Sequence, residues 1–485
     1  TVATTALWIS EAQMLAETEK IIQQEIDFLP LKSYSNITEG NALRIDWKTV
    51  VSVDKLSYII GNPPFVGYSL QSKEQKEDIL SVFVDVNGKP FKTAGKIDYV
   101  AGWYYKAAEL MQHTHIRAAL VSTNSICQGE QVAAIWKPLK DLFGIHIDFA
   151  YRTFRWDSEA SLKAHVHCVI VAFSSVPDSG NKYIFDGNKR SEAANISAYL
   201  IDGPDVYIES RSHPLCDVPE MVTGNRPADG GNLIIEAADY DEFIHQEPSA
   251  LPYIKKLLGA AEFINNKDRW CLWLVGVSPS ELRKMPLVMK RIEACKEDRE
   301  NAPDEGRRKL AITPHLFREQ LNPETSIVVP VVSSERRRYV PMAYLGKDVI
   351  CTDRIKFLPN AGLYHFGVLN SNVHMAWMRV VCGRMKSDYN YSKDIVYNNF
   401  PWPSPTEAQK VKIEQTAQGI LDARALYPDS SLADLYDEVA MPSELRKAHQ
   451  DNDRAVMEAY GWKVCRDFTE STCVAELFKL YQELT

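Results

Sequence analysis

Paired cysteines and long apolar stretches are missing from this sequence of 485 residues. Its 9 cysteines stand singly, and no two have the Cys-x-x-Cys spacing that thiolate zinc sites use. No apolar run approaches the length of a membrane span, and the first residues lack a signal-peptide pattern. We therefore expect a reduced protein of the cytoplasm that holds no metal and has no membrane partner.

An excess of basic charge is also missing. The chain has 55 Lys and Arg against 64 Asp and Glu, which gives a net charge of -9. This balance excludes a protein that is basic overall, but nucleic-acid binding needs only a local basic stripe and stays open. The composition, with 45% hydrophobic and 25% charged residues, is typical of a soluble globular protein. A chain of this length is expected to divide into about two to four domains.

One short stretch organises the chain, namely Ile-Ile-Gly-Asn-Pro-Pro-Phe at residues 59–65. The apolar residues 56–60 predict a short buried strand, which the following glycine and prolines must end. A rigid loop then offers two fixed acceptors, the Asn62 side-chain oxygen and the Pro63 carbonyl, beside the flat face of Phe65. These groups suit a planar ring with an exocyclic amino group, such as an extruded adenine. The alternative is an ordinary strand-terminating turn.

This motif resembles the catalytic motif of amino-group DNA methyltransferases, particularly those that make N6-methyladenine. The resemblance implies catalytic roles for Asn62, Pro63, Pro64 and Phe65. It also implies S-adenosylmethionine as cofactor, with the segment 40–47 lying over its adenine ring. The cofactor-binding residues would then be Asn41, Ala42, Leu43 and Asn62. Taken alone, Gly-Asn-Ala-Leu is more often just a turn.

The first third of the chain alternates between strand and helix patterns. A surface helix is predicted over 6–28. The later pattern is a helix, a buried strand, a helix and a final pair of strands, at 98–111, 117–124, 136–143, 145–151 and 165–173. This order favours a Rossmann-like doubly wound α/β sheet whose site lies at the strand C-termini, where Asn62 and Asn124 both follow strands. The loop 154–157 resembles the family's late motif, which lines the base pocket, although a tryptophan packed on the core is the alternative.

The pattern changes after residue 173. A turn-rich linker at 174–181 is followed by an irregular, proline-rich region with short strands. The charged stretch 282–309 is predicted to be helical with a solvated face, since its acids nearly balance its bases. Three consecutive arginines then follow the apolar run 327–332 and make a local positive edge. We expect Arg336 and Arg337 to bind DNA, while one arginine of the three points inward and pairs with an acid such as Glu335.

The segment 341–403 is similar to the target-recognition domain of single-chain Type IIL restriction-modification enzymes, the MmeI-like family, and the tail from about residue 407 resembles their helical C-terminal domain. The resemblance implies that DNA base edges are touched by Asp353, Arg354, Lys386, Asp388 and Asn390. If residues 386–390 are extended, Lys386, Asp388 and Asn390 project from one face. Lysine donates to guanine and aspartate accepts from cytosine, so the first two match one G·C pair. A solvated strand surface is the alternative.

Three domains are expected from these resemblances. They are a partial class I methyltransferase domain at 1–176, a mixed α+β target-recognition domain at 177–404 and a small helical C-terminal domain at 405–485. The expected partner is double-stranded DNA, and the protein is expected to be a monomer off DNA.

The sequence departs from the family at its start. No glycine precedes Gly40, so the loop that would cradle the methionine end of S-adenosylmethionine is missing. Pro303-Asp304 is followed only by Glu305, without the spaced Glu-x-Lys of a nuclease. Because the chain also opens without methionine in a helix-forming stretch, we expect a fragment with an N-terminally incomplete sheet.

Two other functions stay open at this point. One is a sequence-specific DNA-binding fragment that is catalytically incomplete. The other is methylation of a protein glutamine or an RNA base, since other methyltransferases grip a planar amide or amine similarly. The large region 177–485 argues against the latter, because a small acceptor needs no such reader.

Overall fold

The computed structural model describes residues 2–24, 26, 37–156, 166–176, 180–463, 465 and 468–485. The described residues form two compact units. The first lies within Thr1–Ile126, Ala134–Phe154 and Cys168–Glu192, and the second within Cys127–Ala133, Arg155–His167 and Ala193–Thr485. None of the described helices combines the length and the apolar character that a membrane span requires.

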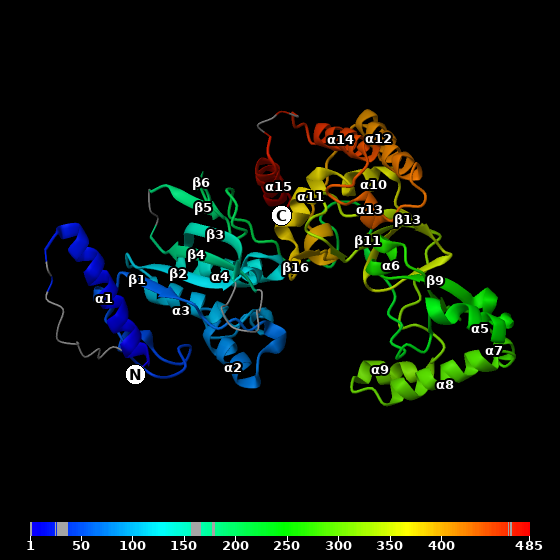
Figure 1. Cartoon of the computed structure of the whole chain (residues 1–485), viewed down its shortest axis with the longest axis horizontal. Helices are drawn as coiled ribbons and strands as arrows, with labels where there is room; N and C mark the ends of the chain where they lie inside the picture. Colours follow the sequence, from blue (N-terminus) through cyan, green and yellow to red (C-terminus); the bar gives the residue numbers. More distant parts are fainter. Residues whose placement is uncertain are drawn as a thin grey trace. The chain divides into compact units, whose positions relative to one another are not determined.

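A six-stranded sheet forms the centre of the first unit (Figure 1). Its strands, in spatial order, are β1 (Tyr58–Gly61), β2 (Arg117–Thr123), β4 (Val166–Ser174), β3 (His146–Trp156), β5 (Lys182–Asp186) and β6 (Lys189–Ala193). The pairs β1–β2 and β3–β5 are parallel, whereas β2–β4 is antiparallel. The α/β class is confirmed. The expectation that the strand near 165–173 ends the sheet is wrong, since β5 and β6 continue it.

Two helices cover the sheet through one aromatic cluster. The helices α3 (Ala101–Met111) and α4 (Gly129–Phe143) both carry apolar residues at helical spacing, as the sequence predicts. Tyr104 of α3 stacks on Phe173 of β4 with ring centroids 5.2 Å apart, and Trp136 of α4 lies edge-on to Tyr104 at 5.4 Å. Because both helices meet the same strand, they pack on the same face of the sheet.

Two further helices complete the described part of this unit. The helix α1 (Val2–Ile22) confirms the surface helix predicted over 6–28 as far as residue 22, and none of its residues is buried. Residues 25, 27 and 28 of that prediction lie outside the described residues. The helix α2 (Lys73–Val82) is not predicted from the polar stretch 69–78, yet it begins with a capping box. In that box the Ser72 side chain accepts from the Gln75 N–H, and the Gln75 side chain accepts from the Ser72 N–H. Local capping therefore starts a helix that apolar periodicity does not reveal.

The strand before the Asn-Pro-Pro-Phe motif is not buried as predicted. In the sheet order β1 is a terminal strand that pairs only with β2. Its Tyr58 and Ile60 side chains are 69% and 81% exposed. The next strand, β2, is buried only on alternate residues, so the expectation of a fully buried strand is also wrong. Tyr58 and Ile60 are two residues apart and therefore project from the same face of β1, which is largely open to solvent at this edge of the described sheet.

The third strand runs further than predicted. The strand β3 continues through Phe154, Arg155 and Trp156, so these residues are not in a loop, and Asp157 lies outside the described residues.

The second unit contains three smaller sheets, which hold the strands around residues 222–390. One has the order β14 (Val349–Cys351), β9 (Ile254–Leu258), β10 (Arg269–Leu272) and β8 (Ile234–Glu236). Another has the order β13 (Ala343–Gly346), β11 (Thr325–Pro330), β15 (Ile355–Pro359) and β7 (Val222–Thr223). The last has three strands, β12 (Val332–Ser333), β17 (Asp388–Asn390) and β16 (Gly383–Met385). The sequence pattern of the segment 341–403 predicts strands at 349–351 and 356–358 around one helix at 366–382. Both strands are confirmed.

Helices surround these sheets and form the C-terminal part of the chain (Figure 1). They are α5 (Tyr240–Gln246), α6 (Ala260–Asn265), α7 (Pro279–Leu282), α8 (Pro286–Glu300), α9 (Glu305–Lys309), α10 (Leu363–Leu369), α11 (Asn372–Val381), α12 (Glu407–Ala425), α13 (Leu432–Leu435), α14 (Ser443–Ala459) and α15 (Glu470–Leu484). The helix predicted at 366–382 is two helices, because Ser371 caps α11 by accepting from the His374 N–H. The tail is helical, as expected.

One arginine of the charged stretch is an internal support. Arg299 of α8 is 0% exposed, which contradicts the expectation of a wholly solvated face. Its guanidinium donates to the backbone carbonyls of Pro227, Ala228, Leu310, Thr313 and Leu316 at 2.7 to 3.0 Å. Five carbonyls thus converge on one side chain, and those of Leu310 and Thr313 also accept from the backbone. Arg299 therefore ties α8 to the segment that follows it and to the distant loop at residues 227–228.

We predict that Arg299→Met destabilises the protein by at least about 3 kcal/mol, because several buried carbonyls lose their donor and each costs roughly 1 to 3 kcal/mol. Urea unfolding of the variant measures the loss. Lys296→Met is the matched control, since Lys296 is on the same helix, is half exposed and should change stability by less than about 0.5 kcal/mol. Equal stability of the two variants would contradict the internal role of Arg299.

Candidate functional site

The loop 62–65 follows β1 directly. It is exposed at Asn62 and Pro64, buried at Pro63 and half-buried at Phe65. Beyond it, the Val66 carbonyl accepts a hydrogen bond from the Tyr99 backbone N–H at 2.9 Å. The loop therefore presents the Asn62 amide outward while the chain next to it is held to the body of the unit.

Asp98 joins the loops that follow the two parallel strands. Its carboxylate is buried, and it accepts from the Tyr68 backbone N–H at 3.0 Å and from the Ser125 hydroxyl at 2.5 Å. Ser125 also hydrogen-bonds Thr123 at the end of β2, at 2.7 Å. Because β1 and β2 are parallel, their following loops start at the same edge of the sheet, as the sequence predicts for Asn62 and Asn124.

Asn124 adds a polar group at this edge. It is 9% exposed, and its Nδ2 donor has no hydrogen-bond partner among the described residues. A buried amide donor without a partner is unusual and costs free energy unless a ligand or water satisfies it.

The loop 41–47 is closed by its own side chains. The Asn41 Oδ1 accepts from the Leu43 N–H at 2.9 Å, and its Nδ2 donates to Asp78 at 2.8 Å. Arg44 and the Tyr99 hydroxyl also donate to Asp78, at 2.6 and 2.9 Å. Burial alone would raise the pKa of Asp78, but the hydrogen bonds from Arg44, Tyr99 and Asn41 lower it below the usual aspartate value. Asp78 therefore acts as a charged anchor for this loop.

Tyr99 connects the two loops that the sequence singles out. Its backbone holds the chain beyond Phe65, and its hydroxyl holds Asp78. Leu43 is 4% exposed and packs at Gly102, where an added Cβ would come within 2.9 Å of Leu43. The Ala42 carbonyl accepts from the Trp47 indole N–H at 2.8 Å. The predicted cofactor residues Asn41, Ala42 and Leu43 are thus brought near the motif by shared anchors, and much of their bonding capacity is used within the loop.

A second group of predicted residues comes together in the second unit through Val331. The Val331 N–H donates to the Arg354 carbonyl at 2.9 Å, and the Val331 carbonyl accepts from the Tyr391 N–H at 2.7 Å. In the adjoining sheet, Val332 of β12 pairs with Asn390 of β17. Segments that are more than 30 residues apart in the sequence therefore lie side by side at the predicted base-reading residues.

Lys386 is not extended as predicted. Met385 of β16 pairs with Asp388 of β17, which leaves Lys386 and Ser387 as the two residues of a hairpin turn. Lys386 has a φ of 60°, in the left-handed region that lysine rarely adopts. Only Asp388 and Asn390, two residues apart on β17, share one face by strand alternation. The prediction of one shared face for all three side chains is wrong, because the strand pattern misses the turn.

Asn225 supports the loop that carries Asp353 and Arg354. The Asp353 N–H donates to the Asn225 carbonyl at 3.0 Å, and the buried Asn225 side chain donates to the Cys351 carbonyl at 3.1 Å. Asp353 lies 3.6 Å from the Arg226 guanidinium, and the side chain of Arg354 is 65% exposed. Arg226 is therefore a further cation beside the predicted residues.

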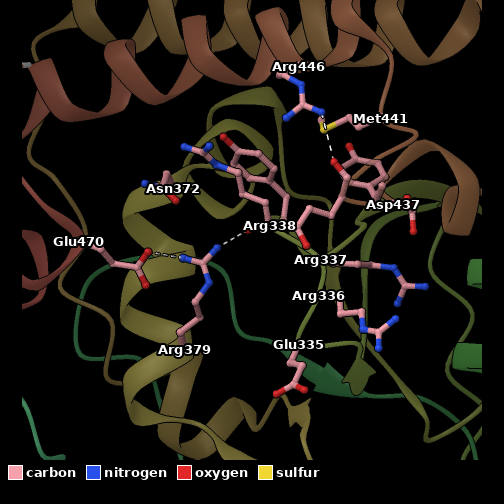
Figure 2. Close-up of a pocket in the computed structure, with 13 residues that line it drawn as sticks. Glu335, Arg336, Arg337, Arg338, Asn372, Arg379, Asp437, Met441, Arg446 and Glu470 are labelled. Carbon is pink, nitrogen blue, oxygen red and sulfur yellow. Dashed lines mark hydrogen bonds and ion pairs between the residues drawn. The ribbon is translucent and has the colours of Figure 1, made fainter. Parts of the chain in front are cut away.

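The three consecutive arginines line a cavity of about 550 Å³ (Figure 2). Figure 2 shows Arg336 and Arg337 together on the side of Asp437, while Arg338 extends towards Asn372. In the part of the chain that the structure describes, neither Arg336 nor Arg337 has a side-chain hydrogen bond or ion pair. Burial lowers the pKa of Arg337. A partly buried guanidinium without an acceptor favours an anion at this place.

The neighbouring arginines are engaged. Arg379 donates to Glu470 at 2.9 Å and to the Arg338 carbonyl, and Arg338 lies 5.7 Å from the ring centroid of Tyr339. The expected pairing of one of the three arginines with Glu335 is wrong, since Glu335 lies 3.7 Å from Arg384 instead.

Several supporting residues were not predicted from the sequence. Asp98, Asp78 and Tyr99 anchor the loops of the first unit, and Arg384 and Arg226 flank the residues predicted to read bases. Asp98 had a local signal, an acid just ahead of a well-defined helix. Asp78, Tyr99 and Arg226 contact residues that are distant in sequence, and Arg384 contacts distant Glu335 as well as its neighbour Ser387, so no local pattern identifies these four.

The chain matches three family models that together cover almost its whole length. They are described as "MmeI, DNA-methyltransferase domain" at residues 1–186, "MmeI, target recognition domain" at 202–404 and "MmeI, C-terminal domain" at 405–485.

Two longer proteins are similar over the full chain. The DNA methyltransferase A of Bacillus subtilis (strain 168) is 40% identical over 489 residues, covering 100% of this chain and 54% of that protein. The solved structure of the Type IIL restriction-modification enzyme MmeI in complex with DNA is 44% identical, with a TM-score of 0.88, and covers 99% of this chain and 64% of that one. The chain thus spans less than two thirds of either relative.

We predict that Asp98→Ala loosens the loop beyond residue 65, because the Tyr68 N–H loses its buried acceptor. Hydrogen exchange measured by mass spectrometry should then be faster by about tenfold in a peptide that covers residues 66–70, as expected when a hydrogen bond worth about 1.4 kcal/mol is lost. Asp98→Asn is the matched control, since its amide can still accept from Tyr68 and donate to Ser125. Unchanged exchange in the alanine variant would show that Asp98 does not hold this loop.

Proposed function

The chain belongs to the MmeI-like family of Type IIL restriction-modification enzymes, and from that premise we propose that it carries out the methyl-transfer and DNA-reading steps of such an enzyme. The proposed reaction transfers a methyl group from S-adenosylmethionine to the N6 amino group of adenine in a specific duplex DNA sequence. The observation that carries this proposal is the anchored Asn62-Pro63-Pro64-Phe65 loop at the end of β1. We further propose that the sheet is part of a Rossmann-like doubly wound sheet, and that the domains span 1–176, 177–404 and 405–485.

The chemistry of the loop follows from its acceptors. An extruded adenine would donate its two amino hydrogens to the Asn62 side-chain oxygen and the Pro63 carbonyl, with its ring stacked on Phe65. These hydrogen bonds shift the nitrogen lone pair towards the position of attack and hold the ring in one orientation. The nitrogen gains a methyl group and loses one proton to solvent. The chain's own residues therefore bind and orient the base, and no covalent enzyme intermediate is needed.

The residues near the motif fit part of the cofactor. S-adenosylmethionine supplies an electrophilic methyl group when bound. Asn41, Ala42, Leu43 and Asn62 would hold its adenosine side, since the anchors Asp78 and Tyr99 bring their loops together. The partnerless Nδ2 donor of Asn124 at the same edge is consistent with a polar ligand there.

Base reading is assigned to one face of the second unit. Asn390 and Arg354 lie beside the segment of Val331, and Asp388 and Lys386 follow along β17 to its hairpin turn. These residues and Asp353 are proposed to touch base edges in the major groove, while Arg336 and Arg337 bind a backbone phosphate. The proposed partner is double-stranded DNA, with the protein a monomer off DNA and acting in the cytoplasm.

A second candidate function is a DNA-binding fragment that does not methylate. The edge strand β1, with Tyr58 and Ile60 largely in solvent, favours it, because β1 pairs on one side only among the described residues and a methyltransferase site beside it is open on the other.

We predict that Asn62→Ala, made in the full coding sequence, abolishes methyl transfer while DNA affinity stays within a few-fold. Loss of the amide removes an acceptor for the reacting amino group but no proposed phosphate contact. Transfer of tritiated methyl groups to duplex DNA measures the first effect and a gel shift the second. Asn124→Ala is an informative comparison, since it changes the other amide of the same edge. If Asn62→Ala methylates normally, the loop is not the catalytic site.

We predict that Arg336→Gln with Arg337→Gln weakens binding to all DNA sequences. Each lost phosphate contact should reduce the slope of log affinity against log salt by about 0.9. Binding titrations between low and moderate salt measure the slope. Arg454→Gln is the control, because Arg454 is exposed and ion-paired with Asp451 outside the cavity. An unchanged slope in the double variant would refute the phosphate role.

We predict that Lys386→Glu with Asp388→Arg inverts the preference at one position from G·C to C·G, since the donor and acceptor exchange places. Each wrong pair should cost roughly 1 to 3 kcal/mol, with the rest of the site unchanged. Selection of bound duplexes from a randomised pool reads the preference. A motif that stays the same, or loses all specificity at once, means that these residues support the fold.

A further inference from the structure

The β16–β17 hairpin holds its proposed reading residues in a strained turn. The two turn residues are Lys386 and Ser387, and Lys386 adopts a φ of 60°. In two-residue hairpin loops such a backbone conformation is normally left to glycine, asparagine or aspartate. A lysine is kept there only if surrounding contacts enforce the conformation.

Arg384 makes those contacts. Its Nη1 donates to the Ser387 carbonyl at 2.9 Å, which holds the peptide group between Ser387 and Asp388. The same guanidinium lies 4.4 Å from the ring centroid of Tyr389, the residue paired with Arg384 across the hairpin. The Arg384 side chain is 22% exposed, so most of it is committed inside the protein.

Glu335 extends the contact to a second segment. Its carboxylate lies 3.7 Å from Nη1 of Arg384, and it directly precedes Arg336 and Arg337. The hairpin and the arginine turn are also joined through β12, where Ser333 pairs with Tyr389. Arg384 therefore lies between the proposed base-reading hairpin and the proposed phosphate-binding turn.

We propose that Arg384, paired with Glu335, is a positioning residue that sets the register between the phosphate contact and the base contact and thereby determines the base pair that the hairpin prefers. The inference rests on the proposed reading role of Lys386 and Asp388. Phosphate contacts fix where a protein sits on the duplex, and base contacts read sequence only from that position. Without the contacts that Arg384 makes with Glu335 and Ser387, the hairpin takes several positions relative to its base pair. Its discrimination between base pairs then falls.

The alternative is that Arg384 itself binds DNA. Its donors suit guanine or phosphate, but its Nη1 already donates to the Ser387 carbonyl and lies beside Glu335, and its guanidinium lies over the Tyr389 ring. A direct phosphate contact would appear in the salt dependence of binding, whereas a positioning role would not.

Selection of bound duplexes from a randomised pool, together with salt titrations, tests the inference on the full chain. Arg384→Lys keeps the charge, but its Nζ is one bond closer to the backbone than Nη1, which makes both the Ser387 and the Glu335 contact. It also removes the planar group that lies over the Tyr389 ring, so it cannot keep these contacts in place. We expect discrimination at the G·C position to fall by about tenfold, within the range of one base contact. Preference at the other positions and the salt slope should not change. Unchanged discrimination, or a slope reduced by about one phosphate contact, overturns the proposal.

Two further variants separate this proposal from the proposed function and from misfolding. Glu335→Gln removes the anchoring charge from a half-exposed position, so it should fold and lower discrimination at the same pair by a smaller factor. If Glu335→Gln discriminates between base pairs as well as the wild type, Glu335 does not anchor Arg384. That result overturns the proposal on its own if Arg384→Lys does not fold. If the Lys386→Glu and Asp388→Arg exchange leaves the selected motif unchanged, the reading role fails first. If that exchange inverts the preference but Arg384→Lys has no effect, only the positioning role fails.

Discussion

The backbone of Val331 is the constraint on which the candidate DNA-reading face depends. Its N–H and carbonyl bond to Arg354 and Tyr391, two residues from segments that are far apart in the sequence. Buried backbone groups need hydrogen-bond partners, and the neighbouring strands fix which partners Val331 can reach. These two bonds therefore place the loop of Asp353 beside β17. The proposed reading side chains are then free to face DNA, because the backbone and the buried residues behind them maintain the geometry.

In the first unit, too, the residues that hold the loops differ from the residues proposed to act on the substrate. Asp98 and Tyr99 lie at the start of α3 and hold the loops beyond β1 and β2, while Asp78 holds the loop of Asn41. The catalytic candidate Asn62 takes no part in this scaffolding and remains exposed. In both units, buried polar residues such as Asp78, Asp98 and Asn225 help to fix the loops, and the residues assigned to chemistry or recognition are presented from those loops. Changes at the buried anchors should therefore alter activity indirectly, through loop position.

The sequence predicts features that depend on local patterns. The loop at Asn62 follows from two prolines, and α3 follows from apolar spacing. It does not predict that Lys386 is in a left-handed turn, because Lys-Ser carries no glycine or asparagine signal and alternation suggested a strand. It also misses the burial of Arg299, since none of the five carbonyls that compensate it lies on its own helix and those of Pro227 and Ala228 come from a distant loop. Errors of this kind arise where a non-local contact overrides the local preference.

The most direct test of the central claim, that one face around Val331 reads the bases, is photo-cross-linking with a duplex that carries a cross-linking base at each position in turn. The cross-linked peptides are identified by mass spectrometry. The account predicts cross-links from base edges to residues 353–354 and 386–390 at neighbouring base pairs. Cross-links confined to other segments of the second unit, such as α8, with none on either of these two, would contradict it.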